Sequence, residues 1–378
     1  MRVLSVSALI DSVTGGGTAE RTLQLARAMS RAGIEVTVLA TDAGLASWHG
    51  APDVGGARLE LVPCLNQRFM VPRLRSSMLE RLVGRVDVVH LCNHWTVLNL
   101  LVQRAARRQG RPYVVCPAGG LPIFGRSKWL KRAYNALGGR SLVAGASAWV
   151  AITRRETEDF RPYGIDPAAI DVIPNGIEPR EYRDGDAAGF RERFGLGDRK
   201  LVLFVGRLNA IKGPDLLLEA FASEARALSH TLVYAGPDGG LRHTLEQSAR
   251  GAGLGERVRF VGWLGGSDKV AAYRAAELVV VPSRQEAMSL VALEAGACGR
   301  PVLMTDRCGF DAALDAGGAV AVPPEPTRLA QALRELLLGG RLDERGARLH
   351  ELVMREYVWD VAVRRYAEVF RRVSAVSA

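Results

Sequence analysis

The chain has 378 residues, enough for two domains at about 150 residues each, and its 48% hydrophobic and 24% charged residues are those of an ordinary globular protein. Its formal net charge of +10 would suit nucleic acid, an anionic membrane or an anionic small ligand. No zinc-finger, RNP or basic-zipper pattern accompanies this charge, so we expect no nucleic-acid partner.

The 5 cysteines are scattered and form no Cys-x-x-Cys pair, which argues against a disulfide framework or a zinc site. No apolar run reaches the roughly 18 residues that a membrane span needs. We therefore expect a cytoplasmic protein.

Short runs rich in Val, Leu and Ile alternate with longer helical stretches along the chain. The first set of expected strands is Val3–Ala8, Val36–Ala40, Asp87–Leu91, Tyr113–Cys116, Ala148–Ile152 and Asp171–Ile173. The second set is Leu201–Val205, Thr231–Ala235, Val258–Val261, Leu278–Val281, Pro301–Thr305 and Ala319–Val322. Because these runs are continuously apolar, we expect parallel sheets that are buried on both faces and an α/β fold.

The polar stretch Asn175–Phe190 separates the two sets and is interpreted as a linker. Each half opens with a strand, a glycine-containing loop and a helix, so we expect two Rossmann-like domains, residues 1–178 and 179–359. The last helix, residues 360–378, is expected to pack back on the first domain. Ligands of such sheets bind at the carboxyl ends of the strands, which predicts a central cleft between the domains as the site.

Three glycines, Gly15, Gly16 and Gly17, follow the first expected strand and precede a helix. Glycine lets the backbone approach a ligand closely, and a helix N-terminus attracts anions. The run is not a complete G-x-G-x-x-G, because Glu20 occupies the third glycine position. A tight turn and an anion or sugar contact remain the two interpretations.

Arg207 and Lys212 follow the first strand of the second half, in the sequence GRLNAIKGPD. The planar fork of arginine and the compact charge of lysine both suit phosphate. A helix that begins near Pro214 would direct its N-terminus to the same place. A solvated loop charge would explain either residue alone, but the pair at a strand end predicts phosphate binding.

Glu286 and Glu294 bracket an otherwise apolar segment. The helix in this segment is expected to begin after Ser289, a good N-cap residue, and to end at Gly299. A pair with a buried arginine would explain Glu294, the only charge of the helix, but Glu286 in the preceding loop does not have that explanation. Carboxylates are natural acceptors for paired hydroxyls, so the glutamates and the cations together predict a nucleotide-sugar site.

These motifs in this order carry a resemblance that runs nearly end to end. VIPNGIE, GRLNAIKG, ERVRFVGW and VPS followed by the Glu-x7-Glu element resemble the retaining GT-B glycosyltransferases of family 4, also called glycosyltransferases group 1. The resemblance implies transfer of a hexose from a UDP- or GDP-sugar to a glycan or lipid-linked acceptor in cell-surface polysaccharide or glycolipid synthesis. It implies no metal and no further cofactor.

The resemblance also implies roles for four side chains. Arg207 and Lys212 would bind the donor diphosphate and, with Glu286, form the catalytic set. Glu286 would contact hydroxyls of the transferred sugar. Glu294 would hold the nucleotide ribose.

Backbone groups complete the implied donor site. Amides near Ser289 and Leu290 would touch the sugar or the phosphate, and Gly16 and Gly17 would close against the sugar from the first domain. The base would lie against the stretch after Val261.

Two features depart from the family pattern. The loop after Tyr113–Cys116 reads CPAGGLPIFGRSK and lacks the histidine that the family often has there, and the run after the first glutamate is AMSL instead of a Gly-Phe-Gly-like run. His94 and Gly119 are the candidates for an acceptor or sugar contact, although a histidine beside Trp95 is more often structural. Both departures concern the surroundings of the sugar.

A dense basic patch, GRSKWLKRAY, follows the loop without a histidine. Arg126, Lys128, Lys131 and Arg132 surround Trp129, and a helix would place 128, 131 and 132 on one face. The patch is interpreted either as a solvated helix face or as a surface for anionic lipid headgroups or a phosphorylated lipid-linked acceptor. The second interpretation would place the protein on the inner face of the membrane.

Two other functions fit parts of the pattern. A sugar-nucleotide epimerase uses the same two-domain plan, but no general acid and base set is evident. A basic membrane- or polymer-binding protein with a degenerate cleft would not need all four donor-site side chains. The only Asp-x-Asp, Asp184 and Asp186, lies in the expected linker and is interpreted as a loop, not as a metal site.

Overall fold

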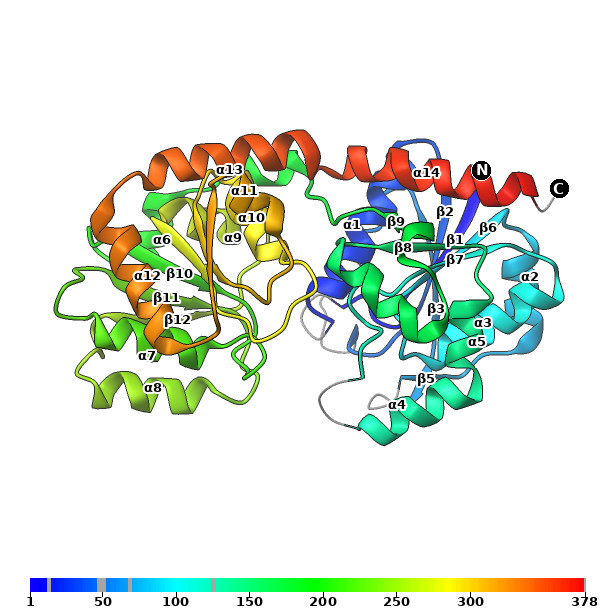
Figure 1. Ribbon diagram of the computed structural model, residues 1–378, viewed down its shortest axis with the longest axis horizontal. Helices are drawn as coiled ribbons and strands as arrows, with labels where there is room; N and C mark the ends of the chain where they lie inside the picture. Colours follow the sequence, from blue (N-terminus) through cyan, green and yellow to red (C-terminus); the bar gives the residue numbers. More distant parts are fainter. Residues whose placement is uncertain (12–14, 46–51, 67–69, 124–126, 377–378) are drawn as a thin grey trace. The chain divides into compact units, whose positions relative to one another are not determined.

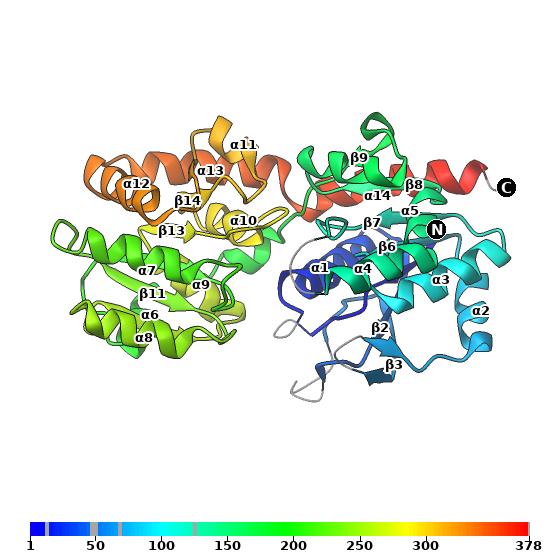
Figure 2. The ribbon, with the colours of Figure 1, turned by 60° about the horizontal axis from the view of Figure 1, so that its bottom comes forward.

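The computed structural model describes residues 1–11, 15–45, 52–66, 70–123 and 127–376, and the chain divides into two compact units. Unit 1 comprises Met1–Asn175 and Trp359–Ala378, and unit 2 comprises Gly176–Val358. Each unit is built on a parallel sheet with helices packed against it, which confirms the α/β class (Figure 1, Figure 2).

Among its described residues, unit 1 has a seven-stranded parallel sheet in the order β3-β2-β1-β6-β7-β8-β9. The strands are β1 (Arg2–Val6), β2 (Glu35–Thr41), β3 (Arg58–Val62), β6 (Val88–Cys92), β7 (Tyr113–Cys116), β8 (Ala148–Ala151) and β9 (Asp171–Val172). The helices are α1 (Gly17–Arg31), α2 (Ser76–Gly84), α3 (Val97–Arg108), α4 (Lys128–Tyr134), α5 (Arg140–Ala144) and α14 (Trp359–Val376). A short antiparallel pair, β4 (Cys64–Asn66) and β5 (Val71–Pro72), lies outside this sheet.

Unit 2 has a six-stranded parallel sheet in the order β12-β11-β10-β13-β14-β15 over the residues described. The strands are β10 (Leu201–Val205), β11 (Thr231–Ala235), β12 (Val258–Gly262), β13 (Leu278–Val281), β14 (Val302–Thr305) and β15 (Ala319–Val322). The helices are α6 (Ala187–Arg193), α7 (Pro214–Ser223), α8 (Arg242–Gly251), α9 (Gly266–Ala275), α10 (Leu290–Ala297), α11 (Asp311–Asp315), α12 (Pro326–Gly339) and α13 (Leu342–Glu356).

The strand order reverses direction once in each sheet. In unit 1 the reversal lies between β1 and β6, and in unit 2 it lies between β10 and β13. Two loops diverge from the carboxyl ends of the strands at such a switch point, and ligands of open parallel sheets bind there. Each unit therefore has one candidate ligand-binding region, at its switch point.

Two segments differ from the sequence-based expectation. Strand β3 was not expected, because it is a polar edge strand in which Arg58 and Glu60 form an ion pair of 2.6 Å. Most of the expected linker, Asn175–Phe190, is instead folded: from Gly176 on it belongs to unit 2, where Ile177, Tyr182 and Phe190 are buried. The sequence did not indicate that these three side chains are buried, because the residues around them are mostly polar.

Helix α14 packs on α1 within unit 1. Trp359 at its start donates from Nε1 to Oε1 of Gln24 at 2.7 Å, and the hydroxyl of Tyr366 accepts from Nη2 of Arg21 at 2.8 Å. Both aromatic side chains are fully buried. The last helix of the chain therefore belongs to the core of its first unit.

Candidate active site

The switch point of unit 2 is shaped by glycine backbone. Gly213 caps α7 with a φ of 68°, and a Cβ at this position would lie 2.1 Å from the carbonyl oxygen of Pro282. Only glycine permits both the left-handed conformation and this close approach. The N-terminus of α7, which starts at Pro214 as expected, is thereby held against the end of β13, where its free amides attract anions.

Two of the predicted residues, Lys212 and Glu286, meet at this switch point. The Nζ atom of Lys212 lies 2.9 Å from Oε1 of Glu286, and their side chains are 33% and 12% exposed. The other carboxylate oxygen of Glu286 accepts from Oγ of Ser283 at 2.9 Å. An ammonium group has three N–H donors, and Lys212 uses one of them in this ion pair. The others can donate to an anion.

Arg207 follows the end of β10 at the same edge of the sheet and is half-buried. The methylene stem of its side chain packs on Gly239, where a Cβ would lie 2.8 Å from Cγ of Arg207. The structure thus places Arg207, Lys212 and Glu286 around one switch point, as the sequence predicted. Two cations, a helix N-terminus and a carboxylate can together hold an anion and accept from hydroxyls.

Glu294 is 5% exposed and lies within a hydrogen-bonded cluster. Its Oε1 accepts from Nζ of Lys269 at 2.7 Å and from the hydroxyl of Tyr182 at 3.2 Å, and its Oε2 accepts from the hydroxyl of Tyr273 at 2.6 Å. The alternative explanation of Glu294, a pair with a buried arginine, is wrong in the identity of the cation, because the partner is Lys269. Burial and the charge of Glu294 raise the pKa of Tyr273 well above its ordinary range.

Sequence reasoning missed all three partners of Glu294. Lys269 and Tyr273 are four residues apart on α9, a spacing that puts both side chains on one face, but nothing in the sequence pairs that face with α10. A carboxylate can accept roughly four hydrogen bonds, and Glu294 already accepts three. It can therefore accept about one more.

Helix α10 begins as predicted. Oγ of Ser289 caps the helix by accepting from the amide of Ala292 at 3.2 Å. The amide of Ser289 itself donates to the carbonyl of Cys308 at 3.2 Å. Of the two predicted amides, Leu290 therefore has the better position, since a helix leaves the first N–H groups without an intrahelical partner.

The stretch after Val261 presents an aromatic ring. Trp263 is 51% exposed and packs over Gly265, where a Cβ would lie 2.4 Å from the ring. Trp263 lies six residues before Lys269, the residue of α9 that contacts Glu294.

In unit 1 the switch point is formed mainly by backbone. Gly16 caps α1 with a φ of 57°, and a Cβ at Gly15 would lie 2.7 Å from the carbonyl oxygen of Asp11. The glycine run is therefore a tight turn into a helix N-terminus, which is compatible with both interpretations from the sequence. One turn further along α1, the buried Arg21 donates from Nε to Oδ1 of Asn175 at 2.8 Å.

The two acceptor candidates of unit 1 are already engaged within the protein. The amide of Gly119 donates to Oε1 of the buried Glu156 at 2.5 Å. His94 is fully buried, and its Nε2 lies 3.0 Å from Oδ1 of Asn135. Burial lowers the pKa of His94 to about 4, so this histidine is neutral and the structural interpretation of it is favoured.

The remaining polar motifs show no metal site. In the part of the chain that the structure describes, no cluster of three or more His, Cys, Asp or Glu residues is placed to hold a metal ion. Asp186 caps α6 by accepting from the amide of Gly189 at 2.9 Å, so this residue of the Asp-x-Asp pair has a local structural role. Nor does any helix among the described residues have the length and apolarity to cross a bilayer.

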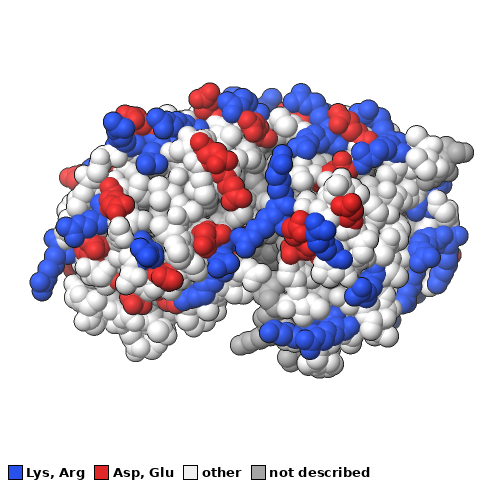
Figure 3. Space-filling model, viewed as in Figure 1, with Lys and Arg blue, Asp and Glu red and all other residues white. Residues whose placement is uncertain are grey.

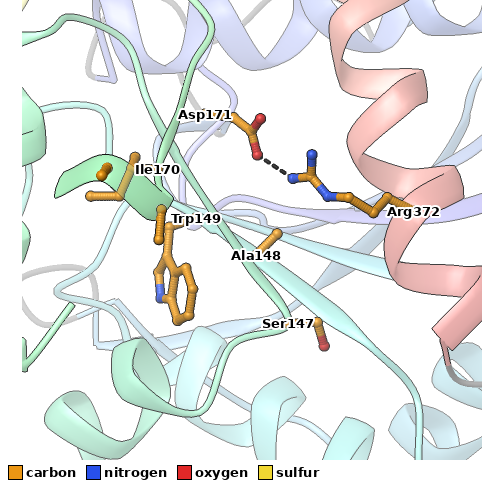
Figure 4. Close-up of a pocket in the computed structure, with 8 residues that line it drawn as sticks. Ser147, Ala148, Trp149, Ile170, Asp171 and Arg372 are labelled. Atoms are coloured by element: carbon orange, nitrogen blue, oxygen red, sulfur yellow. Dashed lines mark hydrogen bonds and ion pairs between the residues drawn. The ribbon is translucent and has the colours of Figure 1, made fainter. Parts of the chain in front are cut away.

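A separate hollow of about 310 Å³ lies in unit 1 beside the ion pair of Asp171 and Arg372 (Figure 4). Ser147 and Ala148 also line it, at the start of β8. These residues mark the amino ends of β8 and β9, opposite to the edge that carries the switch-point loops. The hollow is therefore not part of the candidate site.

Comparison with known proteins supports the expected family. The family model described as glycosyl transferases group 1 matches residues 188–349, and the model of the glycosyl transferase 4-like domain matches residues 16–176. A D-inositol 3-phosphate glycosyltransferase of Actinosynnema mirum is 32% identical over 377 residues, which cover 90% of this chain and 89% of the relative. A relative of the same name from Frankia alni is 35% identical and is matched over 66% of its length.

Solved structures agree on the fold. Sucrose-phosphate synthase from Thermosynechococcus elongatus superposes with a TM-score of 0.80 at 20% identity, over 100% of both chains. HepE of Anabaena, solved in complex with UDP-glucose, gives a TM-score of 0.79 at 18% identity over 98% of this chain and 100% of that one. The chain therefore belongs to the GT-B glycosyltransferases of family 4, the glycosyltransferases group 1, as its motifs indicated.

Proposed function

We propose that this glycosyltransferase moves a hexose from a UDP- or GDP-sugar, with retention of the anomeric configuration, to a glycan or lipid-linked acceptor in polysaccharide or glycolipid synthesis. The observation that carries the proposal is the contact between Lys212 and Glu286 at the switch point of unit 2. Two segments about 70 residues apart in the chain bring a phosphate-binding cation and a hydroxyl-binding carboxylate together there. The complexes of HepE with UDP and UDP-glucose support a nucleotide-sugar donor.

The chemistry follows from the charges at this switch point. Cleavage of the anomeric bond develops positive charge on the sugar and negative charge on the departing diphosphate. Lys212, Arg207 and the N-terminus of α7 supply fixed positive charge for the diphosphate, which stabilises the transition state electrostatically. Glu286 accepts from sugar hydroxyls and faces the developing positive charge.

Retention without an evident protein nucleophile suggests attack from the face that the diphosphate leaves. The departing phosphate oxygen then takes the proton of the acceptor hydroxyl as the new glycosidic bond forms. In this scheme Glu286 orients the sugar and does not form a covalent bond. No metal ion is needed, because the two cations neutralise the diphosphate.

Glu294 is assigned to the ribose, and Trp263 offers a ring against which the base can stack. The single acceptor position left on the Glu294 carboxylate suits one ribose hydroxyl, unless Tyr182 or Lys269 turns away. Gly16, Gly17 and Leu290 remain predicted backbone contacts.

The test is a panel of UDP-, GDP- and ADP-sugars, with release of free nucleotide measured with and without acceptor extracts. D-inositol 3-phosphate is included as a defined acceptor, because the relatives carry this compound in their name. Acceptor-dependent release supports transfer. Interconversion of the sugar nucleotide without release would support an epimerase instead, and absence of both binding and release would support a degenerate binding protein.

We also propose that unit 1 carries the surface that meets an anionic membrane or a phosphorylated lipid-linked acceptor. The surface, here called the α4 surface, consists of the exposed residues Lys128, Trp129, Arg132 and Leu137. Trp129 is 69% exposed beside two cations, a combination that suits the lipid interface. Arg126 of the same basic patch lies outside the described residues.

One basic residue of the patch has a different role from the one predicted. Nζ of Lys131 lies over the ring of Trp95, 5.2 Å from its centroid, and is half-buried. Burial also lowers the pKa of Lys131. The exposed positive charges of α4 are therefore those of Lys128 and Arg132.

A further inference from the structure

Glu156 is a buried carboxylate that the proposed chemistry does not use. It is 3% exposed and follows β8 at the start of a 3-10 helix, Arg155–Tyr163. Each of its oxygens accepts from a backbone amide: Oε1 from Gly119 at 2.5 Å and Oε2 from Ile152 at 2.7 Å. One side chain thus ties the loop after β7 to the end of β8.

The loop that Glu156 holds is a strained turn. The amide of Gly120 closes it by donating to the carbonyl of Pro117 at 3.0 Å, and Ala118 and Gly119 between them have φ angles of 49° and 82°. Alanine is disfavoured in this left-handed region, because its Cβ crowds the following carbonyl oxygen. Such a conformation persists only where the surroundings enforce it, and it is commonest at functional sites.

The turn lies at the functional edge of the unit 1 sheet. It follows the carboxyl end of β7, and a Cβ at Gly120 would lie 3.5 Å from the amide of His94 in the loop after β6. Ala118, Gly119 and Gly120 are half-exposed, whereas the carboxylate that fixes them is hidden below. The turn therefore presents backbone atoms outward while its conformation is set from inside.

The ionised form of Glu156 is the one that fits both amides. A protonated carboxyl group carries a hydrogen on one oxygen and accepts more weakly, so it would hold the two amides less well. Arg21 of α1, Asp159 of the same 3-10 helix and the Cys116 thiol of β7 face this carboxyl group. Burial raises its pKa to about 7, although the two amides and Arg21 oppose the shift.

We propose that Glu156 is a positioning residue for transfer. Its carboxylate fixes the turn of residues 117–120, whose amides are engaged within the protein, so that carbonyl oxygens of the half-exposed residues 118–120 accept from hydroxyls of the acceptor or the transferred sugar. This inference rests on the proposed function, in which unit 1 receives the acceptor. It also explains how the loop can act without the histidine that the family often has there, because the contact would be made by backbone.

The first test is amide hydrogen exchange of the peptide that contains residues 117–120. The variants are Glu156→Gln, the shorter Glu156→Asp and a matched control, Glu158→Gln, which changes an exposed glutamate two residues away. Exchange at pH 8 should rise about 10-fold in Glu156→Gln, less in Glu156→Asp and not in the control, since a charged hydrogen bond is lost. The difference from wild type should shrink at pH 6, where Glu156 is protonated. Equal exchange in wild type and Glu156→Gln would overturn the proposal.

The second test separates positioning from folding and from the donor reaction. UDP binding is measured by calorimetry, and UDP release from UDP-glucose is measured with the acceptor extract that stimulates it most. In Glu156→Gln the kcat/KM for acceptor should fall about 10-fold while the Kd for UDP stays within about 2-fold of wild type.

The pH dependence of kcat/KM for the acceptor is a further measurement, which a purely structural role of Glu156 would not change. Wild type should lose activity below about pH 7 as Glu156 is protonated, and Glu156→Gln should lack that limb. Altered exchange with unchanged transfer would reject a role in the reaction. A wild-type protein that binds neither UDP nor GDP and transfers from neither kind of sugar nucleotide would instead reject the proposed function.

Discussion

Units 1 and 2 share a parallel α/β fold with one switch point each, yet they distribute charge in opposite ways. Unit 1 has 26 Lys and Arg residues against 15 Asp and Glu, a formal charge of +11. Unit 2 has 24 against 25, a formal charge of −1. The whole positive excess of the chain therefore belongs to unit 1.

The carboxyl edges of the two sheets differ in the same way. Unit 2 presents partly exposed charges, Lys212 and Glu286, whereas unit 1 buries its charges, Arg21 and Glu156, and presents backbone. The fold thus determines where each unit can bind a ligand. The side chains determine whether that contact is made by charged groups or by the backbone. Figure 3 shows Lys and Arg side chains on several parts of the face of unit 1 in view.

Glu294→Ala should have the largest effect, because it removes a buried carboxylate and leaves the half-buried ammonium of Lys269 and two tyrosine hydroxyls without this acceptor. We expect a loss of about 3–5 kcal/mol in the unfolding free energy of unit 2, together with weaker UDP binding. Chemical denaturation and calorimetry measure the two effects. The matched control is Glu246→Ala, which removes an exposed ion pair with Arg242. Equal effects of the two substitutions would show that the Glu294 cluster contributes no more than a surface pair.

Acid should destabilise unit 1 more than unit 2. Burial lowers the pKa of His90 to about 3 and that of His94 to about 4, so below pH 6.5 the unfolded state of unit 1 binds protons that the folded state does not. The raised pKa of Glu156 acts in the opposite direction over the same range. Two histidines against one glutamate predict a net loss of about 2–3 kcal/mol between pH 6.5 and 4.5.

Native-state hydrogen exchange of β6 and β13 at the two pH values measures this difference. The opening free energy of β6 should fall with pH, and that of β13 should change little. A larger decrease in β13 would contradict the assignment of neutral buried histidines in unit 1.

Lys212→Ala and Arg207→Ala should each weaken UDP binding through loss of a charge-assisted contact. The expected loss is about 1.5–3 kcal/mol, or roughly 10- to 150-fold in Kd. Calorimetry with UDP is the measurement, and Lys200→Ala, which removes an exposed lysine paired with Glu277, is the control. Wild type should bind equally with EDTA. Dependence on added metal, or binding that neither substitution changes, would refute the cation clamp.

Replacement of Lys128 and Arg132 by Gln should reduce binding to anionic vesicles. Each cation near an anionic surface contributes about 1 kcal/mol, so we expect a loss of roughly 30-fold at low salt and less at high salt. Co-sedimentation with vesicles of neutral or anionic lipid measures the effect. The matched control replaces Arg107 and Arg108, two exposed cations of α3, and removes the same charge. If both double variants bind equally, net charge and not the α4 surface determines the attraction.

Glu286→Gln should have the smallest effect and should act on turnover. Its predicted partner is the transferred sugar, so kcat should fall roughly 10-fold while UDP binding changes little. Steady-state kinetics and calorimetry separate the two, and Asp306→Asn on a neighbouring loop is the control. A variant that loses UDP binding but keeps kcat would exchange the roles of Glu286 and Glu294.

The sequence predicted the features that depend on local pattern. Apolar runs such as Leu278–Val281 must be strands buried on both faces. The starts of α10 after Ser289 and of α7 at Pro214 follow from side-chain and backbone chemistry at a helix start. Residues at the carboxyl ends of neighbouring parallel strands converge by topology, which is why Lys212 and Glu286 meet as expected. The family resemblance added their roles, which remain predictions.

The missed features depend on tertiary partners. In the sequence Tyr182 is part of a polar linker, but in the structure its hydroxyl donates to Glu294. The sequence likewise suggests a solvated charge for Glu156, but its two oxygens accept from two backbone amides. The left-handed Ala118 has no sequence signal, since alanine avoids that region when nothing enforces it. Burial of a polar side chain is decided by the groups that satisfy it, and those lie far away in the chain.

Helix α14 makes the order of synthesis matter. It completes unit 1, yet the ribosome makes it only after all of unit 2, residues 176–358. At about 5–20 residues per second, nascent unit 1 waits roughly 10 to 40 seconds for α14. During that interval the sites for Trp359 and Tyr366 on α1 are uncovered, and Arg21 lacks one of its acceptors. A nascent chain of this protein therefore exposes the face of α1 on which α14 packs, and chaperones can recognise this face until α14 has been made.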